Sequence, residues 1–395
     1  MASSDQVVIL GAARTPIGRL GGTLSQIPSP KLGGVAIRYA LDRASIQPDQ
    51  VEYVIMGNVI SAGVGQAPAR QAALSAGLPE TCPAMTVNKV CASSLMAVVM
   101  ATQMIRAGDA DVIVAGGMES MSQAPHVLKG SRQGKRLGSW ELVDTLIGDG
   151  LWCCQSDLHM GSLAEGTSQE FQISREEQDR FALSSHQKAV KAQANGGFRE
   201  EMAPVAVDSR EGSIVITKDE GPRADATLEA LAKLSPAFPP WKIVTPGNAS
   251  QISDGAAALV VSSETRANAL GLRPLAYIRD YAWVANEPSR LFEAPALAID
   301  KLLKKSKRII TDFDLLEVNE AFAAQILANG KTLHWDWDRV NVKGGAIALG
   351  HPIGATGARI LATLLYALKE RGLSKGLAGL CHGGGGSVAL SIELA

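Results

Sequence analysis

The sequence predicts an α/β fold with two similar halves and a polar segment inserted between them. Three features carry this prediction: short apolar runs alternate with helical segments, one order of helix and strand occurs twice, and the middle of the chain is polar and irregular. The 395 residues are 46% hydrophobic and 19% charged, with a net charge of −1. This composition indicates a soluble globular protein with more than one folding unit.

Strands and helices alternate near the start of the chain. Gln6–Leu10 and Tyr53–Gly57 are short apolar runs of the kind that form buried strands. Between them, Lys31–Asp42 has its apolar residues at helical spacing. The order strand, helix, strand favours an α/β class.

The same order of helix and strand occurs in both halves. Ala92–Arg106 is rich in small and aliphatic residues and is followed by the apolar run Asp111–Gly117, which ends in two glycines. Thr356–Arg371 has a similar composition and precedes Gly376–Cys381, which again leads into glycines. Helices that are apolar around most of their circumference are buried. We therefore expect the two helices to lie side by side between two sheets, with their N-termini at a shared site.

The segment from about Ser120 to Gln251 has a different texture. It holds the basic run Lys129–Arg136 and the helix-like run Ser174–Ala182, with little regular pattern around them. Long insertions with little regular structure are usually lids or binding surfaces. We interpret this segment as an inserted loop domain.

Composition and cysteine spacing favour a cytoplasmic protein without nucleic-acid or membrane partners. The net charge leaves no basic footprint for a nucleic acid. The five cysteines form no C-x-x-C pair, which fits a reducing compartment. The first residues have no leader pattern, the last four are not a peroxisomal address, and no uninterrupted apolar run is long enough to span a membrane.

Five short segments place reactive or backbone-shaping residues in unusual contexts. A cysteine in a small-residue turn before a helix can be a covalent nucleophile, and a histidine held between a glycine and a proline can be its base. A second cysteine beside a glycine run can exchange protons. Together they indicate a two-cysteine acyl-transfer site, on segments Val87–Ser94, His159–Gly161, Asn319–Phe322, Gly350–Gly354 and Cys381–Gly385.

Other interpretations of the same residues remain open at this point. At the start of a helix the pKa of Cys91 is expected to be lowered, but an isolated cysteine is often only a small buried hydrophobe. The glycine run 383–386 could hold a phosphate, although it lacks the Lys-Ser/Thr of a P-loop and the spaced glycines of a dinucleotide site.

These segments resemble those of the thiolases, which join or cleave acyl groups at a coenzyme A thioester, and the resemblance runs from Val7 to the last residues. It implies two halves of βαβαβαββ topology in a five-layered α-β-α-β-α arrangement, with an inserted loop domain. The implied boundaries are 1–121 plus 252–274 for the first half, 122–251 for the loop domain and 275–395 for the second half.

The resemblance also implies roles for the site residues. Cys91 would accept the acyl group, His351 would activate Cys91, and Cys381 would exchange the proton at C2 of acetyl-CoA. The N–H groups of Cys91 and Gly383 would hold the tetrahedral oxyanion, with glycine allowing close approach, and His351 with a water oriented by Asn319 would hold the enolate.

Coenzyme A contacts are implied on several loops. Arg223 suits the nucleotide end and Ser250 a pantetheine amide, while His159 and Met160 resemble residues that border the acyl pocket of the short-chain, acetoacetyl-CoA-using branch. Arg223 as a surface arginine, His159 as a loop histidine and Asn319 as a helix cap are the plainer alternatives. The full predicted set is Leu151, His159, Met160, Arg223, Phe238, Pro246, Gly247 and Ser250.

The implied activity is a ping-pong Claisen condensation of two acetyl-CoA molecules to acetoacetyl-CoA and CoA, together with the reverse thiolysis. The alternatives are a broader-chain 3-ketoacyl-CoA thiolase of fatty-acid β-oxidation and a non-catalytic acyl-CoA or lipid carrier on the same scaffold. No metal or prosthetic group is expected, because the coenzyme A thioesters are substrates. The family also implies a homotetramer or a homodimer.

The sequence departs from the family pattern at a few positions around the site. Ala92 and Ser94 replace the usual glycines after the nucleophile, Ser289–Phe292 lacks a methionine that is often near the acyl pocket, and His382 replaces an aliphatic residue. These departures leave the acyl chain length open.

Overall fold

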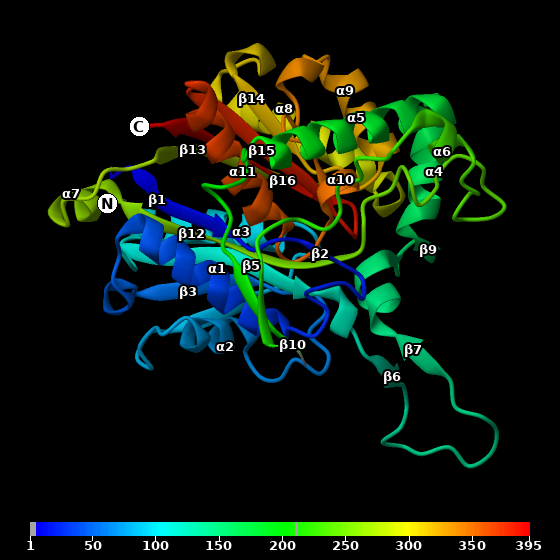
Figure 1. Cartoon of the computed structure of the whole chain (residues 1–395), viewed down its shortest axis with the longest axis horizontal. Coiled ribbons are helices and arrows are strands. Elements are labelled where there is room, and N and C mark those ends of the chain that lie inside the picture. Colours follow the sequence, from blue (N-terminus) through cyan, green and yellow to red (C-terminus); the bar gives the residue numbers. More distant parts are fainter. Residues whose placement is uncertain (1–4, 210–211) are drawn as a thin grey trace.

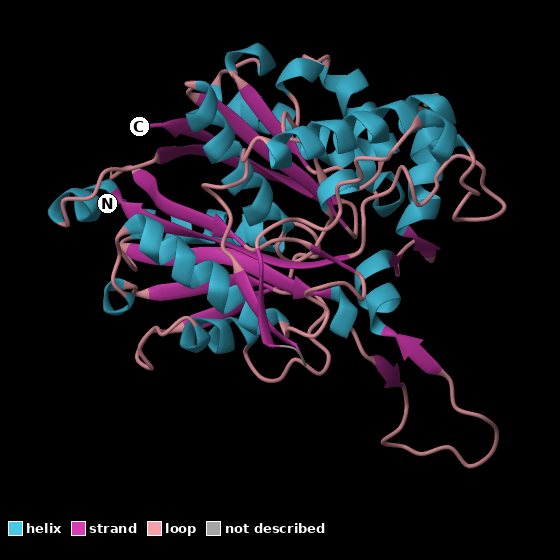
Figure 2. Cartoon of the chain, viewed as in Figure 1, coloured by secondary structure: helices cyan, strands magenta, loops and turns pink. Residues whose placement is uncertain are grey.

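The computed structural model describes residues 5–209 and 212–395. Its two halves stack as five layers, in which two sheets enclose a pair of central helices and carry further helices on their outer faces (Figures 1 and 2). The duplicated α/β fold predicted from the sequence is confirmed. The layers contain α1 (Ser29–Ala44) and α2 (Pro68–Ser75), the first sheet, α3 (Ser93–Ala107) and α11 (Thr356–Arg371), the second sheet, then α8 (Ala294–Ser306) and α9 (Ala323–Leu333).

The two sheets share the order and directions of four strands, and the first sheet has one further parallel strand at its edge. Counted from the junction, the first three strands of each sheet are antiparallel to their neighbours, and the fourth is parallel to the third. The sheets join where Val8 pairs with Tyr277. This repetition is the structural form of the duplication. The order is β4 (Ala84–Val87), β3 (Tyr53–Gly57), β5 (Val112–Ser120), β12 (Ser253–Ser263) and β1 (Val7–Arg14), then β13 (Ala276–Ala285), β16 (Gly386–Leu394), β15 (Lys375–His382) and β14 (Leu315–Val318).

The strands are apolar on both faces because each face packs on helices. Along β5, Val112 and Val114 contact the outer helices, whereas Ile113 and Ala115 contact the central helices. A strand buried on both faces shows no polar alternation. This explains why Asp111–Gly117 is a continuous apolar run.

The central helices α3 and α11 approach closely through small residues. A Cβ added at Gly357 would lie 2.5 Å from the main-chain nitrogen of Leu95, and Ala358 N donates to Ser94 Oγ at 2.9 Å. By length and composition alone Val90–Ala107 could cross a membrane, but 56% of it is buried inside the protein, as in the core helix of a soluble fold. Ser94, a departure from the family pattern, here joins the two halves.

The inserted segment is more regular than predicted. It contains α4 (Met160–Glu170) and the 20-residue α5 (Arg175–Ala194), whose capping box joins Ser174 and Glu177. The length of α5 was missed because its buried face is largely polar, including Gln178, Asp179, Ser185 and His186, so it lacks an apolar stripe.

Several short elements complete the described chain. A long loop between β6 and β7 projects away from the body (Figure 1). These elements are β2 (Gly18–Arg19), α6 (Leu228–Ala232), α7 (Glu264–Ala269), α10 (Ala346–Leu349), and the hairpins β6 (His126–Leu128) with β7 (Leu142–Asp144), β8 (Trp152–Cys153) with β9 (Leu158–His159), and β10 (Val205–Ser209) with β11 (Gly212–Ile216).

The contact between the central helices should tolerate no added methyl group. We expect Gly357→Ala to lower the free energy of unfolding by about 1–3 kcal/mol, because the new Cβ meets the α3 backbone. Gly166→Ala is the matched control, since Gly166 is exposed on α4 and its added Cβ meets nothing within 4 Å. Urea unfolding measures both variants, and equal stability of the two would contradict the prediction.

Candidate active site

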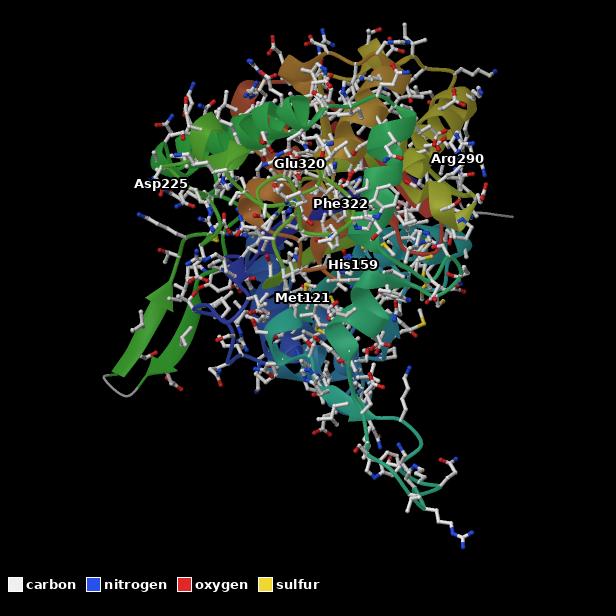
Figure 3. All side chains as sticks on the ribbon, turned by 90° about the vertical axis from the view of Figure 1, so that its right-hand side faces the viewer. Met121, His159, Asp225, Arg290, Glu320 and Phe322 are labelled. Atoms are coloured by element: carbon white, nitrogen blue, oxygen red, sulfur yellow. The ribbon has the colours of Figure 1, made fainter. Side chains whose placement is uncertain are left out.

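A cavity of about 610 Å³ opens between the two halves and the inserted segment. Cys91, His351 and Cys381 all line it, although they are far apart in the sequence. Met121, His159 and Phe322, which also line it, lie together in the middle of one face (Figure 3). The structure thus brings the predicted reactive residues to one place.

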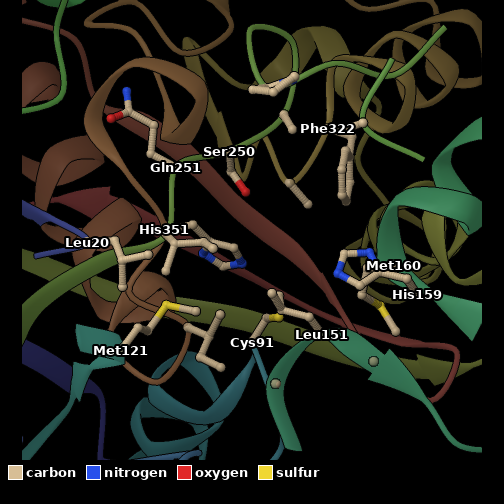
Figure 4. Close-up of a pocket in the computed structure, with 18 of the residues that line it drawn as sticks. Leu20, Cys91, Met121, Leu151, His159, Met160, Ser250, Gln251, Phe322 and His351 are labelled. Atoms are coloured by element: carbon tan, nitrogen blue, oxygen red, sulfur yellow. The ribbon is translucent and has the colours of Figure 1, made fainter. Parts of the chain in front are cut away.

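A strained turn presents Cys91 to this cavity. Val90 has a φ of +48°, in the left-handed region that β-branched residues rarely adopt. Two side chains hold the turn: Asn88 Oδ1 accepts from Val90 N at 3.0 Å, and Ser93 Oγ accepts from Lys89 N at 2.8 Å. Cys91 therefore lies half-buried just before α3, with its side chain at the cavity (Figure 4).

The pKa of Cys91 is raised, which corrects the expectation of a lowered value. Burial raises the pKa to about 12, and the N–H groups of Gly383 and of Cys91 itself, directed at the sulfur, only partly offset this effect. The position at the helix start is overridden by the loss of water around the sulfur. At neutral pH Cys91 is therefore a thiol that must lose its proton as it reacts.

His351 has the charge state and tautomer that a base requires. Burial, reinforced by the positive charge of Arg359, lowers its pKa to about 3, so the ring is neutral. Thr356 Oγ1 donates to the carbonyl of Pro352 at 2.9 Å, so at 2.6 Å it accepts from Nδ1 of His351. This assignment leaves the lone pair on Nε2.

The second cysteine lies at the end of β15. Cys381 is buried, and burial together with the nearby Cys91 sulfur raises its pKa well above the usual range of a thiol. The two thiols are electrostatically coupled, so the first one to ionise makes it harder for the second to do so.

The glycines after Cys381 differ in what an added side chain would meet. A Cβ at Gly383 would make only ordinary contacts, with Val90 Cγ1 at 3.4 Å. Gly384 and Gly385 instead have φ of +86° and +87°, and a Cβ at Gly385 would collide with the carbonyl of Asn286. The turn after Cys381 therefore needs the two later glycines.

Asn319 contacts His351, and its neighbour Glu320 belongs to a separate polar network. Asn319 Nδ2 is 3.4 Å from His351 Nε2, and Asn319 Oδ1 has no hydrogen-bond partner among the described residues. Glu320 accepts from Ser185 Oγ at 2.7 Å and from Asn341 Nδ2 at 2.9 Å. Glu320 thus joins the inserted segment to the second half.

Most of the predicted coenzyme A contacts lie on the main cavity. The ring of His159 stacks on Phe238 at 4.6 Å, and its Nδ1 accepts from Gly161 N at 3.0 Å at the start of α4. Ser250 points into the cavity (Figure 4). The predicted residues that line it are Leu151, His159, Met160, Phe238, Pro246 and Ser250.

Arg223 and Gly247 line a second, smaller cavity of about 230 Å³, and Pro246 lines both cavities. Here the N–H of Arg223 donates to Nδ1 of His186 at 3.2 Å. Burial and the Arg223 charge lower the pKa of His186 to about 4, so this histidine is neutral.

Several cavity residues were missed from the sequence. Phe322 stood inside a quoted motif, and Gln251 followed the predicted Ser250, so both carried a local signal. Met121 carried none, because a lone methionine predicts no chemistry by itself, and the same holds for Thr356, which contacts His351 without lining the cavity. Only their place in the fold identifies them.

This arrangement of two thiols and a neutral imidazole on one α/β cavity defines a thiol-dependent enzyme. The sequence matches the models of the thiolase N-terminal domain over residues 7–265 and the thiolase C-terminal domain over residues 272–394. The chain belongs to the thiolase family, a family of acyltransferases.

Individual relatives cover almost the whole chain. An acetyl-CoA acetyltransferase of Cupriavidus necator is 53% identical over 98% of this chain and 99% of the relative. A probable acetyl-CoA acetyltransferase of Escherichia coli is 49% identical over 98% of each. The crystal structure of the Bacillus anthracis acetyl-CoA acetyltransferase has a TM-score of 0.98 at 44% identity and covers 100% of both chains.

The lowered pKa of His351 predicts a loss of stability in acid. The unfolded chain takes up a proton as the pH falls below about 6.5, whereas folded His351 resists it down to about 3, so stability is lost as the pH falls. From about pH 7.5 to about pH 5.5, this single group should lower the free energy of unfolding by about 1.4 kcal/mol.

Urea unfolding at both pH values should show that His351→Gln loses about 1.4 kcal/mol less than the wild type. His126→Gln, at an exposed position, is the control. The same pH dependence in His351→Gln and the wild type would contradict a neutral, buried imidazole.

Proposed function

We propose that this protein is an acetyl-CoA acetyltransferase, which condenses two acetyl-CoA molecules to acetoacetyl-CoA and CoA and catalyses the reverse thiolysis. The observation that carries the proposal is that Cys91, His351 and Cys381 line one cavity, with the Gly383 N–H directed at the Cys91 sulfur. The names of the relatives support the same substrates. A carrier without chemistry would not need these groups together.

In the first half-reaction Cys91 becomes acetylated. His351 Nε2 takes the thiol proton while the sulfur attacks the thioester carbonyl, because a thiol with a raised pKa cannot ionise beforehand. The N–H groups of Cys91 and Gly383 stabilise the tetrahedral oxyanion. When the carbon–sulfur bond to CoA breaks, the leaving thiolate takes the proton of Cys381.

In the second half-reaction the Cys381 thiolate removes a proton from C2 of a second acetyl-CoA. Burial is the main cause of the raised pKa of Cys381, and acylation, which makes the Cys91 sulfur a neutral thioester, removes the smaller contribution of Cys91. The carbanion then attacks the acetyl group on Cys91 and forms the new carbon–carbon bond. Cys91 leaves as a thiolate and recovers the proton held by His351, so the cycle is balanced.

The enolate oxygen of the second acetyl-CoA needs its own donors. Protonated His351 supplies one through Nε2, and a water oriented by Asn319 supplies the other. The free Oδ1 of buried Asn319 supports this role, because a buried acceptor without a partner is costly unless it binds something.

We also propose the cellular setting. Five free cysteines, two of them reactive in this mechanism, favour a cytoplasmic protein. A thiol and an imidazole supply the nucleophile and base, so the proposed reaction uses no prosthetic group. The exposed Leu137, Trp140 and Leu142 on the projecting β6–β7 loop support a homotetramer, or a homodimer as the smaller alternative.

Substitution of the two cysteines should affect the reaction in different ways. We expect Cys91→Ala to abolish both condensation and thiolysis of acetoacetyl-CoA. Cys381→Ala should lower both by about 10³-fold or more, yet still slowly collect a labelled acetyl group on Cys91, because water can protonate the leaving CoA thiolate whereas nothing else removes the proton at C2 in the second half-reaction. Cys82→Ala, buried under α2 outside the cavity, is the control. Turnover that survives in Cys91→Ala would overturn the mechanism.

An aromatic wall should restrict the acyl group. Phe292 and Phe322 line the cavity and meet edge to face at 5.4 Å. We expect kcat/KM for thiolysis to fall at least about tenfold from acetoacetyl-CoA to 3-ketohexanoyl-CoA, and Phe292→Leu to narrow this gap. Comparable rates on 3-ketohexanoyl- and 3-ketododecanoyl-CoA in the wild type would instead indicate a broader 3-ketoacyl-CoA thiolase.

A further inference from the structure

Glu119, near the end of β5, is a fully buried carboxylate outside the reacting set. Its Oε2 accepts from Gly354 N at 2.9 Å and from Val59 N at 3.0 Å. Its Oε1 accepts from Asn58 Nδ2 at 3.0 Å and from Ile60 N at 3.2 Å. Four donors from two loops therefore meet on one side chain.

These two loops carry the two reacting groups. Gly354 follows His351 by three residues. On the other side, Val59 O accepts from Asn88 Nδ2 at 3.3 Å, and Asn88 holds the strained Val90 immediately before Cys91. A single carboxylate oxygen thus connects the nucleophile turn of the first half to the base loop of the second half.

The surroundings leave the base loop little freedom. A Cβ added at Gly354 would lie 2.6 Å from Glu119 Oε2, and one added at Gly117 would collide with the carbonyl oxygen of Gly354. The loop is therefore packed against the backbone of β5 and held by the Glu119 side chain of the same strand. A small change at Glu119 must move the loop, because the close-packed backbone cannot absorb it.

Keeping this carboxylate buried is costly. Burial raises its pKa to about 7, the N–H donors lower it in part, and Asp254 on the neighbouring β12 raises it further. Side chains that serve only to fill space avoid this cost, whereas an acceptor for four donors cannot be replaced by an apolar residue of the same shape.

We propose that Glu119 is a positioning residue that sets the separation between Cys91 and the base His351. The inference rests on the base role of His351 proposed above. Glu119→Gln keeps the size of the side chain but replaces one acceptor oxygen by an NH2 donor. The NH2 group then faces two donors at one end of the amide, and the contacts that hold the loops at that end are lost.

Alkylation of Cys91 by iodoacetamide tests this inference directly. The sulfur forms a bond to the methylene carbon, iodide leaves, and the thiol proton passes to His351 Nε2, so the rate depends on the pair. We expect Glu119→Gln and His351→Ala each to slow alkylation of Cys91 by about 10- to 100-fold at neutral pH. Peptide mapping measures how much of Cys91 has been alkylated at each time. In the double variant, the Glu119 change should add nothing to the loss in His351→Ala.

Steady-state kinetics provide a second readout. Glu119→Gln should lower kcat for acetoacetyl-CoA thiolysis with an unchanged KM, because the substrate contacts lie elsewhere. Glu201→Gln is the matched control: this carboxylate is equally buried but pairs with Arg14 at 2.5 Å away from the cavity, so it should lose stability and keep kcat. If Glu119→Gln does not fold, Glu119→Asp, which keeps the charge with a shorter reach, should show the same coupling to His351.

The outcomes separate this inference from the proposed function. An unchanged rate in His351→Ala overturns the base role itself. A slow His351→Ala beside an unchanged Glu119→Gln overturns the positioning role alone. The positioning role also fails if the two losses multiply in the double variant, since Glu119 would then act on Cys91 independently of His351.

Discussion

The close contact between α3 and α11 is the constraint on which the site depends. Each helix begins next to a reacting group, Cys91 before one and His351 before the other, so the contact decides how near these groups come. Gly357 lies against the α3 backbone at Leu95, and Ser94 Oγ accepts a main-chain N–H of α11. Interiors are close-packed and transmit strain, so a shift of one helix would be felt at the cavity.

Burial makes the resting site electrically neutral. It keeps Cys91 and Cys381 as thiols and His351 as an uncharged imidazole, which avoids holding isolated charges away from water. In the proposed reaction, charge develops only as bonds are made and broken. The N–H groups of Cys91 and Gly383 are already directed at the Cys91 sulfur, next to which this charge develops. Preorganised donors cost nothing to reorganise at that moment, which is how a neutral site can stabilise anionic intermediates.

The inserted segment completes this site with polar contacts. Its helix α5 buries Ser185 against Glu320, and Glu320 reaches Asn341 in the second half. A buried polar network that is fully paired specifies one arrangement, because any slip leaves donors without acceptors. The cavity walls, including His159 on Phe238, stand between these contacts and the two thiols.

The sequence by itself determined the alternating elements, the duplication and the candidate site residues, because apolar periodicity and short motifs are local properties of the chain. Thr356–Arg371 was predicted with the bounds that the structure shows. Only the tertiary structure decided the raised pKa of Cys91, the tautomer that Thr356 imposes on His351, and the separation of Arg223 from the main cavity. These three features depend on the loss of water around a side chain and on partners from distant segments of the chain. The neighbouring residues in the sequence predict neither.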